Sequence, residues 1–418
     1  MSTLNDTPGG SRLHIGIFGK TNSGKSSFIN AFTKQSVSIV AKEAGTTTDL
    51  VYKPMEIYPL GPCVIIDTAG FADQSALGES RLHKTRLAAE KSDIAVILIS
   101  AENVEKTVQM RNFAEDFFEE AEWYGAFKDK NTPVLFVVSK ADTCSKEQIQ
   151  ELIRKIGVST GEEVVSVSAI TGEGMERVKD ALAGLIPESC GAYSITGDLV
   201  KKSDLVLLVM PQDIQAPKGR LILPQVQTIR ELLDKKCMVM SITTDQFTAS
   251  LSMLKEPPKL IITDSQVFGY VYENKPKESM LTSFSVLFAA YKGDIAYYIE
   301  GAKAIDRLTE KSCVLIAECC THAPLSEDIG REKIPRMLKK RFGDTLRIDF
   351  VSGTDFPENL SEYDLVIQCG ACMFNRKYVL SRVSRGKKQQ VPMTNYGIVI
   401  AHLTGILEQV AIPFAKYE

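Results

Sequence analysis

The sequence predicts an α/β protein of three domains, a larger first domain followed by two smaller ones built on parallel sheets. Short apolar runs of strand length alternate with helix-length amphipathic stretches along most of the 418 residues, a pattern typical of β-α-β units. Residues 183–204 interrupt this alternation with Pro, Gly and Ser and predict a linker. Because a chain of this length supports more than one hydrophobic core, we expect domains at residues 1–186, 187–278 and 279–418.

The composition is that of an ordinary globular protein, with 44% hydrophobic and 24% charged residues. A formal net charge of -3 provides no overall attraction to nucleic acid. No apolar run reaches the roughly 18 residues that a membrane helix needs. The first twelve residues contain no apolar segment typical of a targeting signal. We therefore expect a cytoplasmic protein and expect neither a membrane nor nucleic acid among its partners.

A phosphate-binding loop follows the first predicted strand. Residues 19–26 read GKTNSGKS and match G-x-x-x-x-G-K-S between an apolar strand and a helix start, the context that this motif needs. Gly19 and Gly24 let backbone N–H groups surround phosphate oxygens at the positive end of the helix. Lys25 would reach the β- and γ-phosphates, and the Ser26 hydroxyl would ligate Mg²⁺. The loop residues assigned to the nucleotide are Gly19, Asn22, Ser23, Gly24, Lys25, Ser26 and Ser27.

Two further segments predict contacts to Mg²⁺ and to the terminal phosphate. The strand VIIDTAG places Asp67 where it would hold the Mg²⁺ through a water, and the Gly70 N–H would approach the γ-phosphate. The segment AGTTTD, residues 44–49, would supply a switch threonine to Mg²⁺, with Thr47 preferred and Thr46 second. The residues to which we assign hydrolysis are Lys25, Asn22, Thr47, Asp67 and Gly70.

Base recognition is predicted after two later strands. Ser139, Lys140 and Asp142 end the strand VLFVVSKAD, and Ser168-Ala169 follows another strand. With the phosphate loop, these motifs over residues 12–186 resemble the TRAFAC class of GTPases, whose base-reading motif is Asn-Lys-x-Asp followed by Ser-Ala. The resemblance implies a P-loop GTPase fold that binds GTP or GDP with Mg²⁺.

Asp142 would accept hydrogen bonds from N1 and N2 of guanine, and adenine would leave this carboxylate unpaired. Lys140 would stack its aliphatic stem over the base. Ser139 stands where the class usually has Asn, and its shorter side chain predicts a loss of about 1 kcal/mol of nucleotide binding.

The hydrolytic machinery departs from the Ras pattern. Phe71 follows Gly70, and no Gln is well placed to orient water; Gln74, in the loop FADQS, is the one candidate. By resemblance to potassium-activated GTPases of the tRNA-modification type, Asn22 is a candidate K⁺ ligand; the alternative is a polar loop residue without that role. We expect slow intrinsic turnover.

The middle domain, residues 187–278, contains apolar runs at 205–210, 237–242 and 259–264 separated by helix-like stretches. This order favours a small parallel sheet. The polar residues between the first run and the next helix fit a solvated loop, and nothing in the domain predicts catalysis. We therefore expect an interaction or dimerisation module.

Five of the nine cysteines lie between residues 313 and 372, and the odd count argues against a disulfide framework. Cys320 and His322 follow the predicted strand 313–317, and Cys369 and Cys372 follow the predicted strand 364–368. The carboxyl ends of parallel strands meet at one edge of a sheet, so these side chains should converge. Spacing leaves three interpretations open: buried thiols, a zinc site, or an iron–sulfur cluster.

A GTPase domain, a small middle domain and a C-terminal C-x-H…C-x-x-C pattern resemble the [FeFe]-hydrogenase maturation GTPases, the HydF family. The resemblance implies a [4Fe–4S] cluster on three cysteines, which we assign as Cys320, Cys369 and Cys372. Neighbouring residues on an extended chain point in opposite directions, so we expect Cys319, beside Cys320, to be a packed thiol. It also implies a scaffold that carries the diiron precursor of the hydrogenase. The implied partners are two radical-SAM maturases and the apo-[FeFe]-hydrogenase, and we expect a homodimer or a higher oligomer.

Gln368 stands where many relatives have His before the C-x-x-C. The fourth iron ligand would then come from His322, Glu327, water or the cargo.

The expected function is a GTPase scaffold that delivers the diiron precursor to apo-hydrogenase. One alternative is a potassium-dependent GTPase acting in RNA modification or ribosome assembly, with a structural zinc site. Another is a cluster-bearing redox sensor that uses GTP only for regulation.

Overall fold

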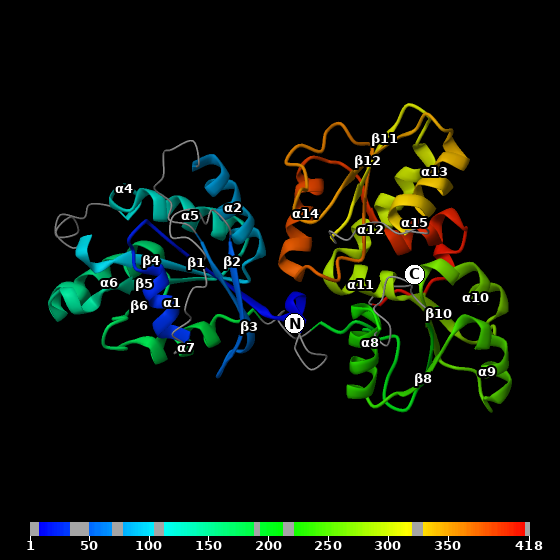
Figure 1. Ribbon diagram of the computed structural model, residues 1–418, viewed down its shortest axis with the longest axis horizontal. Coiled ribbons are helices and arrows are strands. Elements are labelled where there is room, and N and C mark those ends of the chain that lie inside the picture. The colour runs from blue at the N-terminus through cyan, green and yellow to red at the C-terminus, as the bar shows by residue number, and fades with distance from the viewer. Residues whose placement is uncertain are drawn as a thin grey trace, which may run out of the picture. The chain divides into compact units, whose positions relative to one another are not determined.

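The computed structural model describes residues 8–33, 50–68, 78–103, 113–187, 193–211, 221–319 and 329–413. The chain divides into two compact units, residues 1–191 and 192–418 (Figure 1). The α/β fold class is confirmed, with one six-stranded sheet in the first unit and two four-stranded sheets in the second. No helix in these ranges is both long and apolar enough to cross a membrane.

The sheet of the first unit has the order β2-β3-β1-β4-β5-β6, and only β2 runs antiparallel to its neighbour. Every residue of β1, β4 and β5 is buried, because helices cover both faces of the sheet. The strands are β1 Leu13–Gly19, β2 Val51–Ile57, β3 Gly61–Asp67, β4 Ile94–Ser100, β5 Val134–Ser139 and β6 Val164–Ser166.

Helices α1 and α7 pack on one face of this sheet, and α2, α5 and α6 pack on the other (Figure 1). Helix α6 shows how local sequence sets a boundary: the Ser145 side chain accepts from the Gln148 N–H in a capping box. The helices are α1 Lys25–Thr33, α2 Gly78–Lys91, α4 Phe113–Asp116, α5 Phe118–Asp129, α6 Lys146–Thr160 and α7 Met175–Gly184, with short 3₁₀ turns Gly9–Ser11, Ala101–Asn103 and Ala141–Thr143.

The first sheet of the second unit is wholly parallel, with the order β10-β9-β7-β8. Its strands are β7 Leu205–Val209, β8 Met238–Ile242, β9 Leu260–Thr263 and β10 Met280–Ser283. Its helices are α8 Leu223–Asp234, α9 Phe247–Met253, α10 Phe268–Asn274 and α11 Phe284–Lys292, with 3₁₀ turns Thr244–Gln246 and Ser265–Val267.

The last sheet is also parallel and has the order β12-β11-β13-β14. Its strands are β11 Cys313–Ala317, β12 Arg347–Val351, β13 Leu365–Gln368 and β14 Met393–Asn395. Its helices are α12 Ile295–Ala302, α13 Ile334–Phe342, α14 Arg376–Lys388 and α15 Tyr396–Leu403, with a π turn Ile329–Lys333 and 3₁₀ turns Lys303–Arg307 and Leu407–Gln409.

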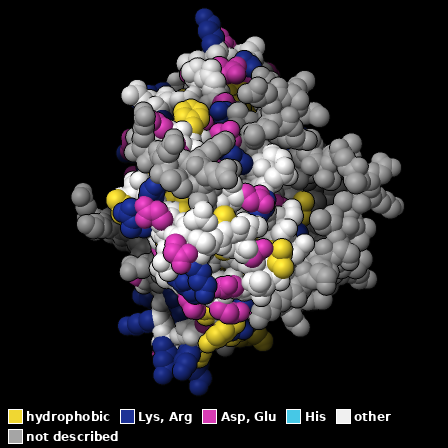
Figure 2. Space-filling model, turned by 90° about the vertical axis from the view of Figure 1, so that its left-hand side faces the viewer, with side chains coloured by type: hydrophobic (Ala, Val, Ile, Leu, Met, Phe, Trp, Pro, Cys, Tyr) yellow, Lys and Arg dark blue, Asp and Glu magenta, His cyan; other side chains and the backbone are white. Residues whose placement is uncertain are grey.

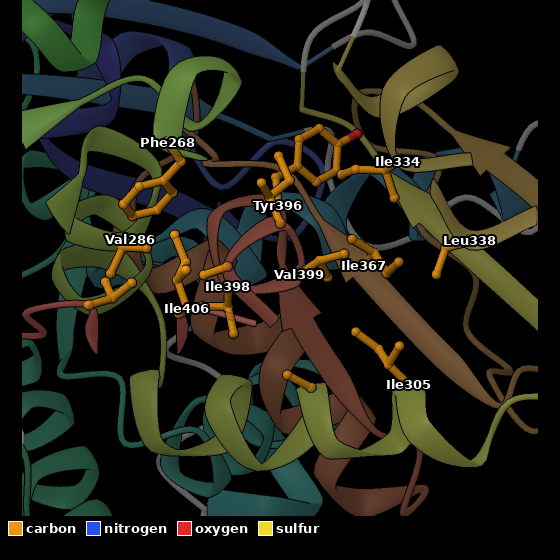
Figure 3. Packing of buried hydrophobic residues seen from close by; sticks show 14 of the residues in the cluster. Phe268, Val286, Ile305, Ile334, Leu338, Ile367, Tyr396, Ile398, Val399 and Ile406 are labelled. Carbon is orange, nitrogen blue, oxygen red and sulfur yellow. The ribbon is translucent and has the colours of Figure 1, made fainter. Parts of the chain in front are cut away.

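The two sheets of the second unit share one hydrophobic core. Helix α15 lies in its middle, and Ile398 and Val399 pack between Phe268 of α10, a helix that accompanies the earlier sheet, and Ile367 of the later sheet (Figure 3). Strand β10 begins just after the expected boundary at 278/279 and pairs with β9 of the earlier sheet. The two boundaries between the three expected domains themselves stay predictions.

Candidate functional site

The phosphate loop joins the end of β1 to the start of α1. Three of its residues have left-handed backbone: Gly19 (φ +148°), Asn22 (φ +65°) and Gly24 (φ +85°). A Cβ atom on Gly19 would lie 2.7 Å from the Leu98 carbonyl oxygen, so this position requires glycine. Asn is among the few other residues that tolerate such backbone, which gives Asn22 a conformational role whether or not it binds an ion.

Lys25 lies inside this loop. Its Nζ donates to the carbonyl oxygens of Gly19 at 2.9 Å and Lys20 at 2.8 Å. Burial lowers the pKa of Lys25 to about 8, although the negative charges of Asp67 and Glu120 oppose the shift. The ammonium therefore lies where phosphate oxygens could replace these two carbonyl oxygens as its hydrogen-bond partners.

The predicted Mg²⁺ ligands lie near this ammonium. Asp67 ends β3 and pairs in register with Ile17 of β1, next to the loop. Burial raises the pKa of Asp67, and Lys53 and Lys25 oppose the rise. Ser26 is exposed in the first turn of α1, where its hydroxyl can reach a cation.

Ser139 connects the predicted base-reading segment to the phosphate loop through a hydrogen bond. It is buried at the end of β5, and its Oγ donates to the Ser23 carbonyl oxygen at 2.6 Å. We expected fewer contacts here than Asn would make, and a contact to the loop is nevertheless present. Lys140 has left-handed backbone and pairs with Glu102 through an Nζ–Oε2 distance of 2.5 Å.

The other base-reading residues lie on adjoining turns. Asp142 is exposed in the 3₁₀ turn after β5, and the Ala141 N–H donates to the Val167 carbonyl oxygen at 3.0 Å. That bond links this turn to the segment after β6, in which Ser168 is buried and Ala169 half-buried. The structure thus brings the base-reading and phosphate-binding segments to one end of the sheet. Thr46, Thr47, Gly70, Phe71 and Gln74 lie outside the described residues.

The second site lies where β11 and β13 end side by side. Ala317 of β11 is in register with Gln368 of β13. The backbone N–H of Cys319, after β11, donates to the Sγ of Cys369, after β13, at 3.1 Å. Cys369 and Cys372 are half-buried, and the turn between them passes through left-handed backbone at Ala371 (φ +51°).

Cys319 is buried beside this turn. Burial raises the pKa of its thiol, whereas a hydrogen bond from the Cys319 side chain is the main cause of a lowered pKa at Cys369. Cys320, His322 and Glu327 lie outside the described residues. Within the ranges that the structure describes, no group of three or more His, Cys, Asp or Glu residues is arranged to hold a metal.

Lys292, at the end of α11, is a residue of this site that the sequence motifs did not indicate. Its Nζ donates to the carbonyl oxygens of Ala371 (3.2 Å), Cys372 (3.0 Å) and Phe374 (2.6 Å), and its side chain is buried. Burial lowers its pKa to about 8, and the nearby cysteines oppose this shift. The available signal was a lone lysine at the end of the otherwise apolar helix FSVLFAAYK.

Arg382 of α14 is a second buried cation that was missed. Its guanidinium carbon lies 4.7 to 4.9 Å from the ring centroids of Phe356, Phe374 and Tyr378. Its Nη2 donates to the Gly353 carbonyl oxygen at 2.5 Å. Arg382 thus fixes Phe374, the residue whose carbonyl bonds Lys292.

Similar proteins identify both parts of the chain. Residues 14–140 match the family model of the 50S ribosome-binding GTPase domain. Residues 195–293 match the hydrogen maturase F dimerization domain, and residues 296–413 match the hydrogen maturase F tetramerization domain.

The chain is also similar to curated GTPases over part of its length. GTPase Der of Mycoplasmopsis pulmonis is 33% identical over 178 residues, which are 40% of this chain and 38% of that protein. GTPase Era of Erythrobacter litoralis is 28% identical over 43% of this chain and 57% of that protein. The tRNA modification GTPase MnmE of Ehrlichia canis is 38% identical over 24% of this chain and 23% of that protein. The chain thus spans well under two thirds of each of these relatives.

The two hydrogen maturase F models together match more than half of the chain, and each describes an oligomerisation domain. They follow a GTPase domain with a complete phosphate-binding loop. The chain therefore belongs to the HydF family of hydrogenase maturation GTPases.

Proposed function

We propose that this chain hydrolyses GTP and serves as a scaffold for hydrogenase maturation. In this proposal it binds a [4Fe–4S] cluster, receives the diiron precursor of the hydrogenase active site and delivers it to apo-[FeFe]-hydrogenase. The observation that carries the proposal is the contact between the Cys319 N–H and the Cys369 sulfur at the joined ends of β11 and β13. Radical-SAM maturases, as the source of the cargo, and an oligomeric, cytoplasmic scaffold belong to the same proposal.

The residues present fit an iron–sulfur cluster. Cys369 and Cys372 offer two thiolates from one turn, and thiolates are the soft, anionic ligands that such clusters require. A backbone N–H bonded to a ligand sulfur, as at Cys369, is a common means of tuning a cluster. Cys320 would be the third ligand, and His322 or Glu327 would complete the set unless water or cargo does. When bound, the cluster would supply an iron corner with an exchangeable ligand.

The nucleotide domain would act as the switch. Lys25 would exchange its loop carbonyls for phosphate oxygens, Ser26, Thr47 and Asp67 would hold Mg²⁺, and Asp142 would select guanine. K⁺ beside Asn22 would provide positive charge where other GTPases use an arginine. Hydrolysis supplies no redox chemistry, so coupling to the cluster would run through the switch segments.

The alternative of an RNA- or ribosome-directed GTPase with structural zinc is not favoured, because the C-terminal half matches hydrogen maturase F domains. The surface agrees: Figure 2 shows Lys and Arg side chains interspersed with Asp and Glu over the described part of one face. A broad basic field, the usual footprint of nucleic-acid binding, is not seen on that part of the surface.

The test is anaerobic reconstitution with iron and sulfide, followed by absorption spectroscopy and metal analysis. The parent should become brown and hold about four irons per chain, the content of one [4Fe–4S] cluster. Cys320→Ser, Cys369→Ser and Cys372→Ser should each lose this chromophore, whereas Cys237→Ser, which removes a buried thiol after α8, should keep it. A colourless parent with one zinc per chain would contradict the proposal and support the zinc alternative.

A further inference from the structure

Lys292 connects the end of α11 to the cysteine turn. It ends α11, yet its ammonium bonds three carbonyl oxygens that lie 79 to 82 residues later in the chain. Two of these carbonyls belong to Ala371 and Cys372, inside the C-x-x-C. We propose, resting on the cluster-binding function above, that Lys292 is the positioning residue of the cluster site: it fixes the Cys369–Cys372 turn and places a buried positive charge beside the cluster.

The first argument is backbone geometry. Ala371 adopts left-handed backbone, which is unfavourable for a residue with a Cβ atom, and persists only where the surroundings hold it. Solvent water does not compete for the Lys292 ammonium, since the residue is only 1% exposed. The bonds to the Ala371 and Cys372 carbonyls fix the peptide planes on both sides of Cys372, and those planes set the direction of its side chain. The third bond, to the Phe374 carbonyl, fixes the chain just after the turn.

The second argument is charge. In the described part of the chain, the Lys292 ammonium has no carboxylate within ion-pair distance and bonds only neutral carbonyls, 5.7 Å from the centre of the Phe288 ring. A buried cation without an anion is costly, so proteins seldom keep one without a partner. The thiols of Cys319, Cys369 and Cys372 lie close enough to act on this charge. A cluster bound by these thiolates would be the anionic partner that the Lys292 ammonium otherwise lacks among the described residues.

The third argument is mutual anchoring. Arg376, which begins α14 just after the cysteine turn, donates to the carbonyl oxygens of Tyr291 at 3.3 Å and Gly293 at 3.2 Å. Tyr291 and Gly293 flank Lys292 in the chain. Helix α14, which follows the cysteine turn, therefore fixes the backbone around Lys292, and Lys292 in turn fixes the cysteine turn. The connection runs in both directions and leaves Lys292 little freedom to move.

Two consequences follow for a protein without this ammonium. In the metal-free state the turn would open more often, so Cys369 and Cys372 would react faster with a small alkylating reagent. In the cluster-loaded state the reduction potential would become more negative, because reduction adds negative charge that the ammonium stabilises.

The experiment compares the full-length parent with Lys292→Met, Lys292→Arg and the control Lys275→Met. Lys275 also donates to two backbone carbonyls, those of Pro276 and Ser279, but these carbonyls lie in the segment between α10 and β10 rather than in the cysteine turn. The readouts are the midpoint potential of the reconstituted cluster and the iodoacetamide rate constant of the Cys369 and Cys372 thiolates in metal-free protein. The rate constant is taken by mass spectrometry over a pH series, because losing the ammonium also disfavours thiolate formation and would otherwise mask faster opening of the turn. Circular dichroism reports whether each variant is folded.

Lys292→Met should alkylate at least about tenfold faster, as expected for losing hydrogen bonds to a charged donor. Its cluster should have a more negative potential, and Lys292→Arg, which keeps the charge, should stay closer to the parent. A folded Lys292→Met protein that holds no iron would equally support the inference. If Lys292→Met does not fold, Lys292→Gln, which also removes the charge, takes its place in both measurements.

Parent-like alkylation and potential in the neutral variants would overturn the inference, as would equal changes in Lys275→Met. The proposed function fails separately, when the parent itself takes up no cluster.

Discussion

The two candidate sites use a buried lysine in the same manner but recruit it from different distances. In the nucleotide loop, Lys25 bonds carbonyl oxygens five and six residues before it. In the cysteine turn, Lys292 bonds carbonyl oxygens about eighty residues after it. Burial lowers the pKa of both lysines to about 8. In each site a desolvated ammonium shapes a loop that follows a parallel strand.

The two lysines differ in the role that we propose for them. Lys25 sits in the loop that its ligand enters, so phosphates can replace the carbonyls and release the loop to respond. Lys292 stands outside the cysteine turn and holds it from a helix of the core, so its contacts need not break when a cluster binds. The arrangement at Lys25 suits a nucleotide switch, and the arrangement at Lys292 suits a fixed platform for a cluster, formed by the cysteine turn of residues 369–372. The predictions below test that contrast, beginning with the largest effect.

Exchanging the base-reading carboxylate should change the nucleotide domain alone. In Asp142→Asn, the amide can donate to the extra carbonyl of xanthine, so xanthosine triphosphate should gain on GTP by on the order of 100-fold. Competition binding of the two nucleotides measures this ratio, and iron content after reconstitution should equal that of the parent. An unchanged preference for GTP would show that Asp142 does not read the base.

Potassium should accelerate the switch and leave the platform unaffected. We expect at least about tenfold faster GTP turnover in KCl than in NaCl, a smaller gain than an arginine finger gives. Asn22→Gly, which keeps left-handed backbone accessible, should abolish the difference without unfolding the loop. Equal parent rates in the two salts would end the potassium assignment and leave Asn22 with its conformational role.

Nucleotide binding should take up a proton above pH 8. The pKa of Lys25 is about 8 in the free protein, and phosphate oxygens would raise it, so at pH 9 binding must first protonate the amine. GDP affinity should therefore fall by up to about tenfold per pH unit above pH 8 and stay flat just below it. Calorimetry in buffers of different ionisation enthalpy counts the proton. Alkylation of Cys372 should not change on GDP addition; a large change would mean that the platform also switches.

The smallest expected effect concerns the tether, by which we mean the hydrogen bond from Ser139, in the predicted base-reading segment, to the phosphate loop. Ser139→Ala removes the 2.6 Å bond to the Ser23 carbonyl and should weaken GDP binding by about fivefold, the value of one hydrogen bond. Ser145→Ala, which removes only the α6 cap, serves as the control and should bind GDP like the parent. Unchanged affinity in Ser139→Ala would mean that the tether does not stabilise the bound state.

Local patterns predicted one site better than the other. The phosphate loop lies within eight consecutive residues, the strand at 313–317 was found at the predicted bounds, and the strand predicted at 364–368 begins one residue later. The pairing of β10 with the earlier sheet was not predicted, because strand order depends on packing around α15 rather than on neighbouring sequence. Lys292 could not be predicted as part of the cysteine site, since spacing carries no information across about eighty residues.

The central claim is that GTP turnover and cluster-dependent hydrogenase maturation belong to separate sites on this chain. The most direct measurement is activation of apo-[FeFe]-hydrogenase by the parent, by Lys25→Met and by the double variant Cys369→Ser, Cys372→Ser, with GTP turnover and iron content measured on each preparation. The account predicts that the double variant hydrolyses GTP at the parent rate, holds no cluster and activates no hydrogenase, whereas Lys25→Met keeps its cluster and loses turnover. A double variant that lacks the cluster and still activates hydrogenase to the parent level would contradict it.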